Sequence, residues 1–222
     1  MNYYSEKDIQ DIVLGVLKKA GTCVSSEAAP SFQGEPFPVE VSARHIHLTT
    51  EAVETLFGRG YRLTKKKDLS QPGEFLSNER VKLVTAKGEI ANVAVLGPER
   101  KAVQAELSAT DARTLGVKAP VNLSGDLAGA DDLMVIGPEG FLMAKGCAII
   151  AKAHIHMTPE DASRYGVQDG QKVRVHLDTA RPVTLEDVII RVKSSFSLAM
   201  HIDFDEANAS MLSGSATGRI VR

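Results

Sequence analysis

Residues 151–166 read AKAHIHMTPEDASRYG, and the organisation of the whole chain can be worked out from this stretch. His154 and His156 follow an apolar run, Gly146–Ala153, which predicts a buried strand. The residues TPED at 158–161 predict the start of a helix, with threonine as the N-cap and proline at the first helical position. Because residues i and i+2 of a strand share a face, both imidazoles point the same way, just before a helix N-terminus that favours anions.

The same unit occurs earlier in the chain. Val41–Phe57 reads VSARHIHLTTEAVETLF and carries His45 and His47 in a second HIH. A third, degenerate copy, Gln104–Val117 (QAELSATDARTLGV), aligns without a gap on HIHMTPEDASRYGV and puts Glu106 at the second histidine position. A carboxylate also coordinates metals, so this replacement keeps the capacity to bind an ion. The repeated HIH units predict two related halves that face each other.

These units predict metal binding. Five of the six histidines lie in HIH, HIH and MHID, the last of which contains His201. Catalytic zinc takes three protein ligands and keeps one position open, so the candidates divide into two sets: His45, His47 and Glu106, and His154, His156 and His201. Two such sites facing each other predict a two-metal centre with ions about 4–6 Å apart. Neutral imidazoles favour zinc, although cobalt, manganese and iron accept the same ligands.

Composition narrows the function further. The chain has 222 residues and a formal net charge of −2, which gives no indication of general nucleic-acid binding. The two cysteines are far apart, as in a protein of a reducing cytoplasm, and no apolar run approaches the ~20 residues of a membrane span. The P-loop, GxGxxG and GxSxG motifs are absent. Chemistry therefore depends on metal, positive charge and the substrates' own nucleophiles.

Short strands dominate from Phe37 onward, and such a pattern is typical of β-barrels or sandwiches. The predicted helices in this part are Thr50–Leu56, Thr110–Leu115 and Pro159–Tyr165. The predicted strands are Pro38–Ala43, Val81–Thr85, Glu89–Leu96, Val121–Leu123, Leu133–Ile136, Cys147–Ala153, Lys172–Leu177, Val183–Val192 and Leu198–Ile202.

The N-terminal region forms a separate piece. Residues 5–20 predict an amphipathic helix in which Ser5 and Asp8 resemble a capping box, and an apolar stripe includes Ile9, Ile12 and Val16. The polar, Pro-containing stretch Gly21–Pro36 predicts a linker. The helix either packs on its own domain or detaches and docks on another protein.

Two cationic stretches have alternative interpretations. Tyr61–Gln71 (YRLTKKKDLSQ) is either a solvated loop or a contact for a phosphorylated substrate. Gly97–Lys101 predicts a turn that carries Arg100 just before Glu106. This turn is either an ordinary surface feature or part of the site.

At these residues the chain resembles a known family, the PduL-type phosphate acyltransferases (phosphate propanoyltransferases). The shared stretches are SARHIHL, KKDLSQPGEF, NVAVLGPER, ELSATDARTLG, AHIHMTPEDA and MHIDFDEAN, and the match covers roughly Phe37 to Arg222. Members of this family transfer an acyl group between coenzyme A and phosphate. They have two β-barrel domains with a two-metal site, usually zinc, at their interface.

The resemblance implies a mainly β fold with two β-barrel domains and short capping helices, preceded by an N-terminal amphipathic helix. It implies a helix over 1–20, a linker over 21–36, one barrel from 37–46 with 153–222, and a second barrel from 47–152, with the active site at the interface. It assigns one zinc ion to His45, His47 and Glu106 and another to His154, His156 and His201.

The resemblance also assigns substrate contacts. Arg100 matches the arginine that contacts phosphate, and the pocket-lining positions match Ser42, Lys67, Leu96 and Asn208. One departure is Ala94, which stands where the family commonly has arginine, so that part of the contact with coenzyme A or phosphate differs.

The implied reaction interconverts a short-chain acyl-CoA such as propanoyl-CoA, plus phosphate, with acyl phosphate and coenzyme A. Phosphate would attack a metal-polarised thioester directly. Two alternatives use the same ligands: a two-metal hydrolase of an acyl or phosphorylated substrate, and a zinc-stabilised interaction module. The resemblance further implies a homo-oligomer of the bacterial cytoplasm, or a protein held inside a bacterial microcompartment by shell or cargo contacts of residues 5–20. It implies no nucleic-acid or membrane partner.

Overall fold

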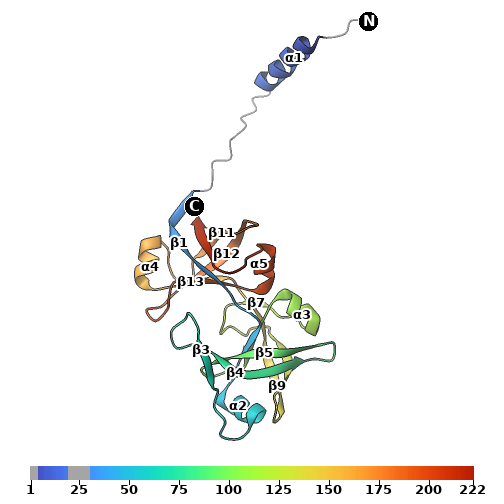
Figure 1. The fold of residues 1–222 in the computed structure, drawn as a ribbon, viewed down its shortest axis with the longest axis vertical. Coiled ribbons are helices and arrows are strands. Elements are labelled where there is room, and N and C mark those ends of the chain that lie inside the picture. Colours follow the sequence, from blue (N-terminus) through green and yellow to red (C-terminus); the bar gives the residue numbers. More distant parts are fainter. Residues whose placement is uncertain (1–4, 20–30) are drawn as a thin grey trace. The chain divides into compact units, whose positions relative to one another are not determined.

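The computed structural model describes residues 5–19 and 31–222, and Figure 1 shows its elements. In these ranges the strands are β1 (Phe32–Val41), β2 (His45–His47), β3 (Lys65–Asp68), β4 (Phe75–Val84), β5 (Glu89–Gly97), β6 (Gln104–Leu107), β7 (Val121–Asn122), β8 (Asp131–Ile136), β9 (Phe141–Ala151), β10 (His154–Met157), β11 (Lys172–Asp178), β12 (Val183–Val192), β13 (Ala199–Ile202) and β14 (Ala216–Val221). The helices are α1 (Glu6–Lys19), α2 (Thr50–Phe57), α3 (Ala109–Leu115), α4 (Pro159–Tyr165) and α5 (Phe204–Ala209).

The strands close into two barrels, which confirms the predicted mainly β fold with short helices. Barrel 1 has the strand order β1-β13-β10-β12-β11-β14. Barrel 2 follows β4-β5-β2-β6-β9 and is closed by β8, which pairs with both β4 and β9. The short strands β3 and β7 extend this sheet beside β4 and β9.

The chain crosses between the barrels at two equivalent places. Strand β1 belongs to barrel 1 and is followed at once by β2 of barrel 2, while β9 of barrel 2 is followed by β10 of barrel 1. The first crossing occupies residues 42–44, so the predicted boundary at 46/47 was wrong. It would have divided β2, although all three β2 residues pair with β5 and β6.

The predicted linker also needs correction. Strand β1 begins at Phe32, inside the stretch expected to be a linker, because its residues pair into barrel 1. Residues 1–4 and 20–30, which include the rest of that linker, lie outside the described residues. Six elements lie outside the predicted ranges: the short strands β2, β6 and β10, the strand β3 in the cationic stretch 61–71, and α5 and β14 near the C-terminus.

A short strand followed by a capped helix is the repeated unit of the fold, and the structure adds a fourth copy, β13–α5. The N-caps of α2, α3, α4 and α5 are Thr49, Ser108, Thr158 and Asp203, and each side chain accepts a hydrogen bond from a backbone N–H of the first turn. The copies pair within each barrel, β2 with β6 and β10 with β13, both antiparallel. Each barrel therefore brings two equivalent strand ends together.

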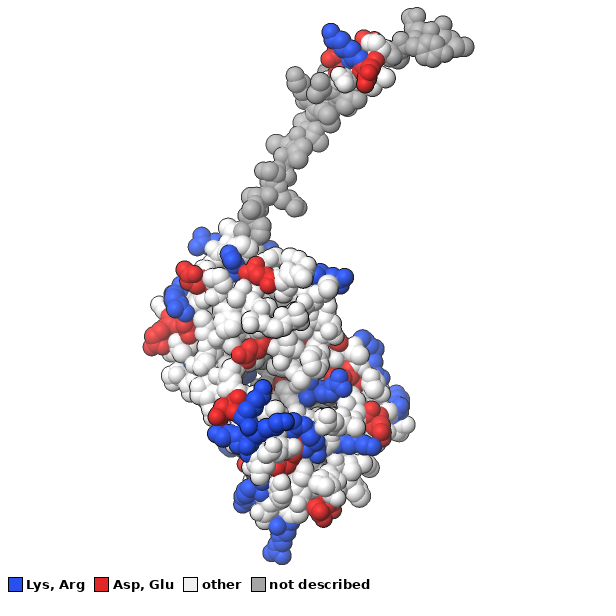
Figure 2. Space-filling model, in the orientation of Figure 1, with Lys and Arg blue, Asp and Glu red and all other residues white. Residues whose placement is uncertain are grey.

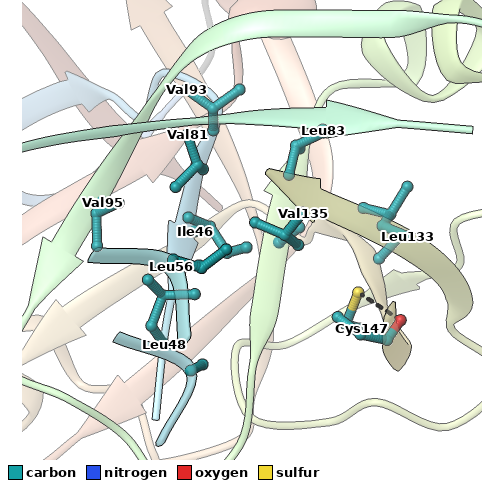
Figure 3. Close-up of a cluster of buried hydrophobic side chains, with 14 of the residues drawn as sticks. Ile46, Leu48, Leu56, Val81, Leu83, Val93, Val95, Leu133, Val135 and Cys147 are labelled. Carbon is teal, nitrogen blue, oxygen red and sulfur yellow. Dashed lines mark hydrogen bonds between the residues drawn. The ribbon is translucent and has the colours of Figure 1, made fainter. Parts of the chain in front are cut away.

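Each barrel has its own hydrophobic core. Ile46 of β2 is fully buried with Leu56, Val81 and Val95 in the core of barrel 2, part of which is drawn in Figure 3. Ile155 of β10 occupies the same place in the core of barrel 1. Because neighbouring side chains on a strand face opposite ways, the histidines on either side of these isoleucines point away from the cores.

Helix α1 precedes both barrels in the chain. Its predicted capping box is confirmed: Ser5 N–H donates to Asp8 Oδ2 at 2.9 Å, and Asp8 N–H donates to Ser5 Oγ at 3.2 Å. The side chains of Ile9, Ile12 and Val16 are exposed. Within the described ranges, no helix is both long enough and apolar enough to cross a membrane.

Glu206, in the capping box of α5, predicts that the stability of the folded protein depends on pH. Burial, together with the charges of Asp203 and Asp205, raises the pKa of Glu206 from 4.5 to about 7. The folded state therefore binds a proton between these values while the unfolded state releases it, and the contribution of Glu206 to stability falls as pH rises through this window. We expect Glu206→Gln to gain stability relative to the wild type between pH 5 and pH 8, by at most roughly 3–4 kcal/mol, since one pKa unit corresponds to ~1.4 kcal/mol.

Thermal unfolding of both proteins at several pH values measures this difference. Glutamine keeps an oxygen that can accept the Asp203 N–H, which donates to Glu206 at 2.9 Å in the native protein. Glu160→Gln is the matched control, because Glu160 lies exposed in the first turn of α4. Parallel pH curves for the wild type and Glu206→Gln would contradict the expectation.

Candidate metal centre

The first candidate cluster consists of His45, His47 and Glu106 in barrel 2. In the antiparallel pair of β2 with β6, His45 lies directly opposite Glu106. Glu106 oxygens lie 3.6 Å from His45 Nε2 and 3.8 Å from His47 Nε2. One potential ligand atom from each residue lies within 4.8 Å of the others, and all three residues are buried. This cluster could therefore hold a metal ion.

The charges in this cluster favour a bound cation. Burial opposes ionisation of Glu106, but the charges and hydrogen bond of the adjacent histidines outweigh it and hold the pKa of Glu106 well below its usual range. Burial and the positive charges of His45 and Arg100 lower the pKa of His47 well below its ordinary value. At neutral pH the cluster therefore offers a carboxylate and a neutral imidazole, the forms that coordinate metals.

The second candidate cluster consists of His154, His156 and His201 in barrel 1. The ladder of β10 and β13 places His154 opposite His201, as β2 and β6 place His45 opposite Glu106. The three ring centroids lie 4.7 to 5.3 Å apart. Burial, with neighbouring histidine or arginine charges, lowers the pKa of His154 and of His201 to about 4 and that of His156 to about 2. These imidazoles are neutral at pH 7.

Hydrogen bonds fix the first histidine of each HIH in the same way. His45 Nδ1 lies 2.8 Å from the carbonyl oxygen of Ala43, and His154 Nδ1 lies 2.8 Å from that of Lys152. Since a carbonyl only accepts, each Nδ1 donates, and Nε2 is the ring nitrogen left for coordination. Burial lowers the pKa of His45, but the charge and hydrogen bond of Glu106 outweigh it and raise that pKa, so His45 would release a proton on binding a metal. A backbone partner two residues upstream thus sets the tautomer suited to coordination.

The second histidine of each HIH has the opposite feature. His47 Nδ1 and His156 Nδ1 are buried, and neither has a hydrogen-bond partner in the described part of the chain. A buried polar atom without a partner is costly, and the same nitrogen is left in this state at the equivalent histidine of each barrel. The imidazole and carboxylate donors of the two clusters match the chemistry of a transition-metal site.

One pocket joins the two clusters. Its lining includes His45 and Glu106 from barrel 2 and His154 and His201 from barrel 1. Ser42, at the first crossing between the barrels, also lines it. Five residues predicted from sequence thus meet at a single cavity.

Arg100 lies in the connection between β5 and β6 and takes part in a polar network beside the first cluster. Its guanidinium donates to Glu74 Oε1 at 2.8 Å and to Ser124 Oγ at 3.1 Å. Gln104 donates to the same Ser124 Oγ at 2.8 Å and to Glu106 Oε1 at 2.6 Å. Gln104, which occupies a histidine position of the repeat, thus orients the Glu106 carboxylate.

Of the predicted substrate contacts, only Ser42 is among the pocket-lining residues, so Arg100 and the others lie outside this lining. Lys67 is exposed on β3, and Figure 2 shows Lys and Arg gathered on the face where Figure 1 places that strand. Leu96 lies on β5 directly beside His47, and Ala94 lies beside His45. Asn208 is exposed on α5.

The sequence analysis did not identify two residues, Gln71 and Glu40, that lie beside His201 of the second cluster. Gln71 is buried, and its amide both donates to the Ser197 carbonyl at 3.0 Å and accepts from the Ser197 N–H at 3.2 Å. Its Nε2 also lies 3.4 Å from His201 Nε2. On the other side of that ring, Glu40 Oε2 lies 3.8 Å from His201 Nδ1. A glutamine in a polar loop gives no local signal of such a contact, because its partners are distant in sequence.

Comparison with known proteins places the chain in a family. Residues 38–213 match the family model described as phosphate propanoyltransferase. The chain belongs to the phosphate propanoyltransferase family. A protein of that name from Alkaliphilus metalliredigens is 45% identical over 217 residues, covering 98% of this chain and 99% of its own length. Those of Leptotrichia buccalis and Lachnoclostridium phytofermentans are 51% and 55% identical, covering 84% and 81% of this chain and 88% and 84% of their own lengths.

The first cluster can be tested by removing its charge. Glu106→Gln keeps the shape of the side chain but loses the carboxylate, so we expect it to bind about one metal ion fewer per chain than the wild type, because a three-ligand site rarely survives on two ligands. Elemental analysis after dialysis against metal-free buffer measures this loss. Glu79→Gln is the matched control, since Glu79 is an equally buried carboxylate on β4, outside both clusters. A full metal complement in Glu106→Gln would contradict the assignment.

Proposed function

We propose that the protein is a phosphate acyltransferase that interconverts a short-chain acyl-CoA, such as propanoyl-CoA, plus phosphate with acyl phosphate and coenzyme A. The observation that carries the proposal is the pocket lined by ligand residues of both clusters. Membership of the phosphate propanoyltransferase family supports the choice of reaction. The acidic balance of the chain, with a net charge of −2, is compatible with small-molecule substrates.

We further propose a pair of zinc ions in each chain. His45, His47 and Glu106 would hold one ion, and His154, His156 and His201 the other. The pairing of equivalent strands supports two sites, because each barrel offers three side chains from the same positions of its ladder. Neutral imidazoles favour zinc among the common divalent ions. When bound, the metal would supply Lewis-acid polarisation of a carbonyl and a site for a soft thiolate.

The chain's own residues would then position the substrates. Arg100 has the planar fork that binds phosphate in a bidentate manner, and Glu74 and Ser124 hold that fork in place. Ser42 would contact the substrate from the pocket wall. Lys67, Leu96 and Asn208 remain proposed substrate contacts.

The reaction needs no covalent intermediate with the protein. A phosphate oxygen forms a bond to the thioester carbonyl carbon, and the carbon–sulfur bond breaks to release coenzyme A as the thiolate. Fixed orientation of the two reactants removes much of the entropic cost of a bimolecular step. Gln104 supports this orientation indirectly, because its amide fixes the carboxylate of Glu106.

The decisive experiment compares metal-free and zinc-reloaded protein with propanoyl-CoA, with and without phosphate. We expect thiol release that requires both zinc and phosphate and that is matched by formation of acyl phosphate, since phosphate is the attacking nucleophile. Thiol release independent of phosphate would identify a hydrolase instead. No thiol release by the zinc-loaded protein would favour an interaction module stabilised by metal.

We also propose that α1 is a docking helix that targets the protein to a bacterial microcompartment or supports self-association. The exposed Ile9, Ile12 and Val16 support this role, since a helix of four turns is marginal in water unless something buries its apolar side. A shell or cargo protein, or a second copy of the chain, would cover this side.

Deletion of residues 1–20 tests this role. We expect unchanged kcat and metal content, little change in melting temperature, and loss of co-purifying shell proteins or of higher oligomers, because the barrels contain the whole proposed site. Exposed Asp11→Asn, which leaves the apolar side chains intact, is the control for changes on α1. A truncated protein that is insoluble or melts far lower would show instead that the helix is part of the fold.

A further inference from the structure

Arg191 lies beside the second cluster and has no role in the proposed function so far. It is the direct register partner of His156 in the parallel pair of β12 with β10. Residues paired in this way extend to the same face of a sheet. In barrel 2 the equivalent partner of His47 is Leu96, so only barrel 1 places a cation at this position.

Aromatic contact holds the Arg191 side chain near the cluster. Its Cζ lies 5.8 Å from the centre of the Phe196 ring, and that ring lies 4.2 Å from the ring of His156. Lys193 approaches the same ring at 5.9 Å but is exposed. The guanidinium is also close enough to Glu106 and Arg100 of barrel 2 for their charges to act on it.

The guanidinium of Arg191 feels the charges of Glu106, Asp169 and Glu74, but none of these carboxylates of the described residues pairs with it directly. In the described ranges, no hydrogen bond or ion pair to it is formed, although burial is the main cause that lowers its pKa. Other arginines at comparable depth are engaged: Arg100 with Glu74, and Arg44 with Asp111 at 3.1 Å. A guanidinium always keeps its charge and has five donors, so a partly buried one without acceptors favours binding of an oxyanion.

We propose that Arg191 is a substrate-binding residue that holds a phosphoryl oxyanion beside the His154–His156–His201 cluster. This inference rests on the proposed function and extends it. A planar fork suits two oxygens of one phosphoryl group. The oxyanion comes either from the phosphate that is transferred or from the phosphate groups of coenzyme A. In the first case Arg100 and Arg191 would approach the same group from opposite barrels.

Steady-state kinetics of Arg191→Gln and Arg191→Lys, with Arg174→Gln as the control, test the proposal. Arg174 is an exposed arginine of the neighbouring strand β11. We expect Arg191→Gln to raise the KM of the bound substrate about 10- to 100-fold, as for loss of a charge-assisted hydrogen bond, with partial recovery in Arg191→Lys and none of this in the control. Metal content should equal that of the wild type.

The source of the oxyanion follows from which KM rises. A selective rise for phosphate identifies the transferred group. A rise for propanoyl-CoA that disappears with a propanoyl-pantetheine thioester, which lacks the nucleotide phosphates, identifies coenzyme A. Either result supports the proposal, whereas both KM values within about twofold of the wild type would overturn it, since that change is below 0.5 kcal/mol.

Two further measurements distinguish failure of this inference from failure of the proposed function. Loss of metal from both Arg191 variants would show that the arginine supports the histidines, and would also overturn the proposal. If the wild type shows no phosphate-dependent thiol release, the proposed function fails. Calorimetric titration of zinc-loaded protein with inorganic phosphate and with coenzyme A then decides on Arg191: weaker binding of either ligand in Arg191→Gln supports it, and equal binding of both overturns it.

Discussion

Residues two apart on a strand share a face, and this constraint underlies the whole arrangement of the site. In each HIH the central isoleucine is committed to a barrel core, where Ile46 and Ile155 are fully buried. The flanking histidines therefore have to point to the opposite face. The antiparallel neighbour strand then places one more ligand-type residue across from the first histidine, Glu106 in one barrel and His201 in the other. Hydrophobic burial of one residue thus orients three potential ligands.

The two clusters have the same backbone geometry but different charge. Replacing a histidine by Glu106 gives the first cluster a carboxylate, which Gln104 and the neighbouring histidines keep ionised. The second cluster has only imidazoles, with Glu40 on one side of His201 and the charge of Arg191 acting on His156. A cation should therefore bind more strongly in the first cluster, while an anionic ligand is better tolerated beside the second. The difference between Glu106 and His201 at equivalent positions thus gives the site two unlike sides.

Local sequence patterns were enough to predict the repeated strand–helix unit. Features that depend on contacts between residues distant in the sequence were predicted less well. The boundaries of α4 and β12 agree with the predicted Pro159–Tyr165 and Val183–Val192, because caps, proline and apolar runs act on neighbouring residues. The candidate ligands were found because they recur in equivalent positions. The place where the chain crosses between barrels was misjudged, since pairing of β2 with β5 and β6 depends on residues about fifty positions away. Gln71 and Arg191 were missed for a similar reason, because the residues they contact belong to other elements of the fold.

Directional contacts between the barrels explain how two separate cores can share one site. Apolar burial stabilises each barrel but sets no register between them, because the hydrophobic effect has no direction. Hydrogen bonds do: Gln71 pairs with the Ser197 backbone, Ser70 Oγ donates to Glu40 at 2.5 Å, and Thr110 N–H donates to Asp205 at 2.7 Å. Two of these hydrogen bonds involve residues close to His201, namely Gln71 and Glu40. These polar contacts, unlike the apolar cores, are therefore specific to one placement of the two barrels around His201.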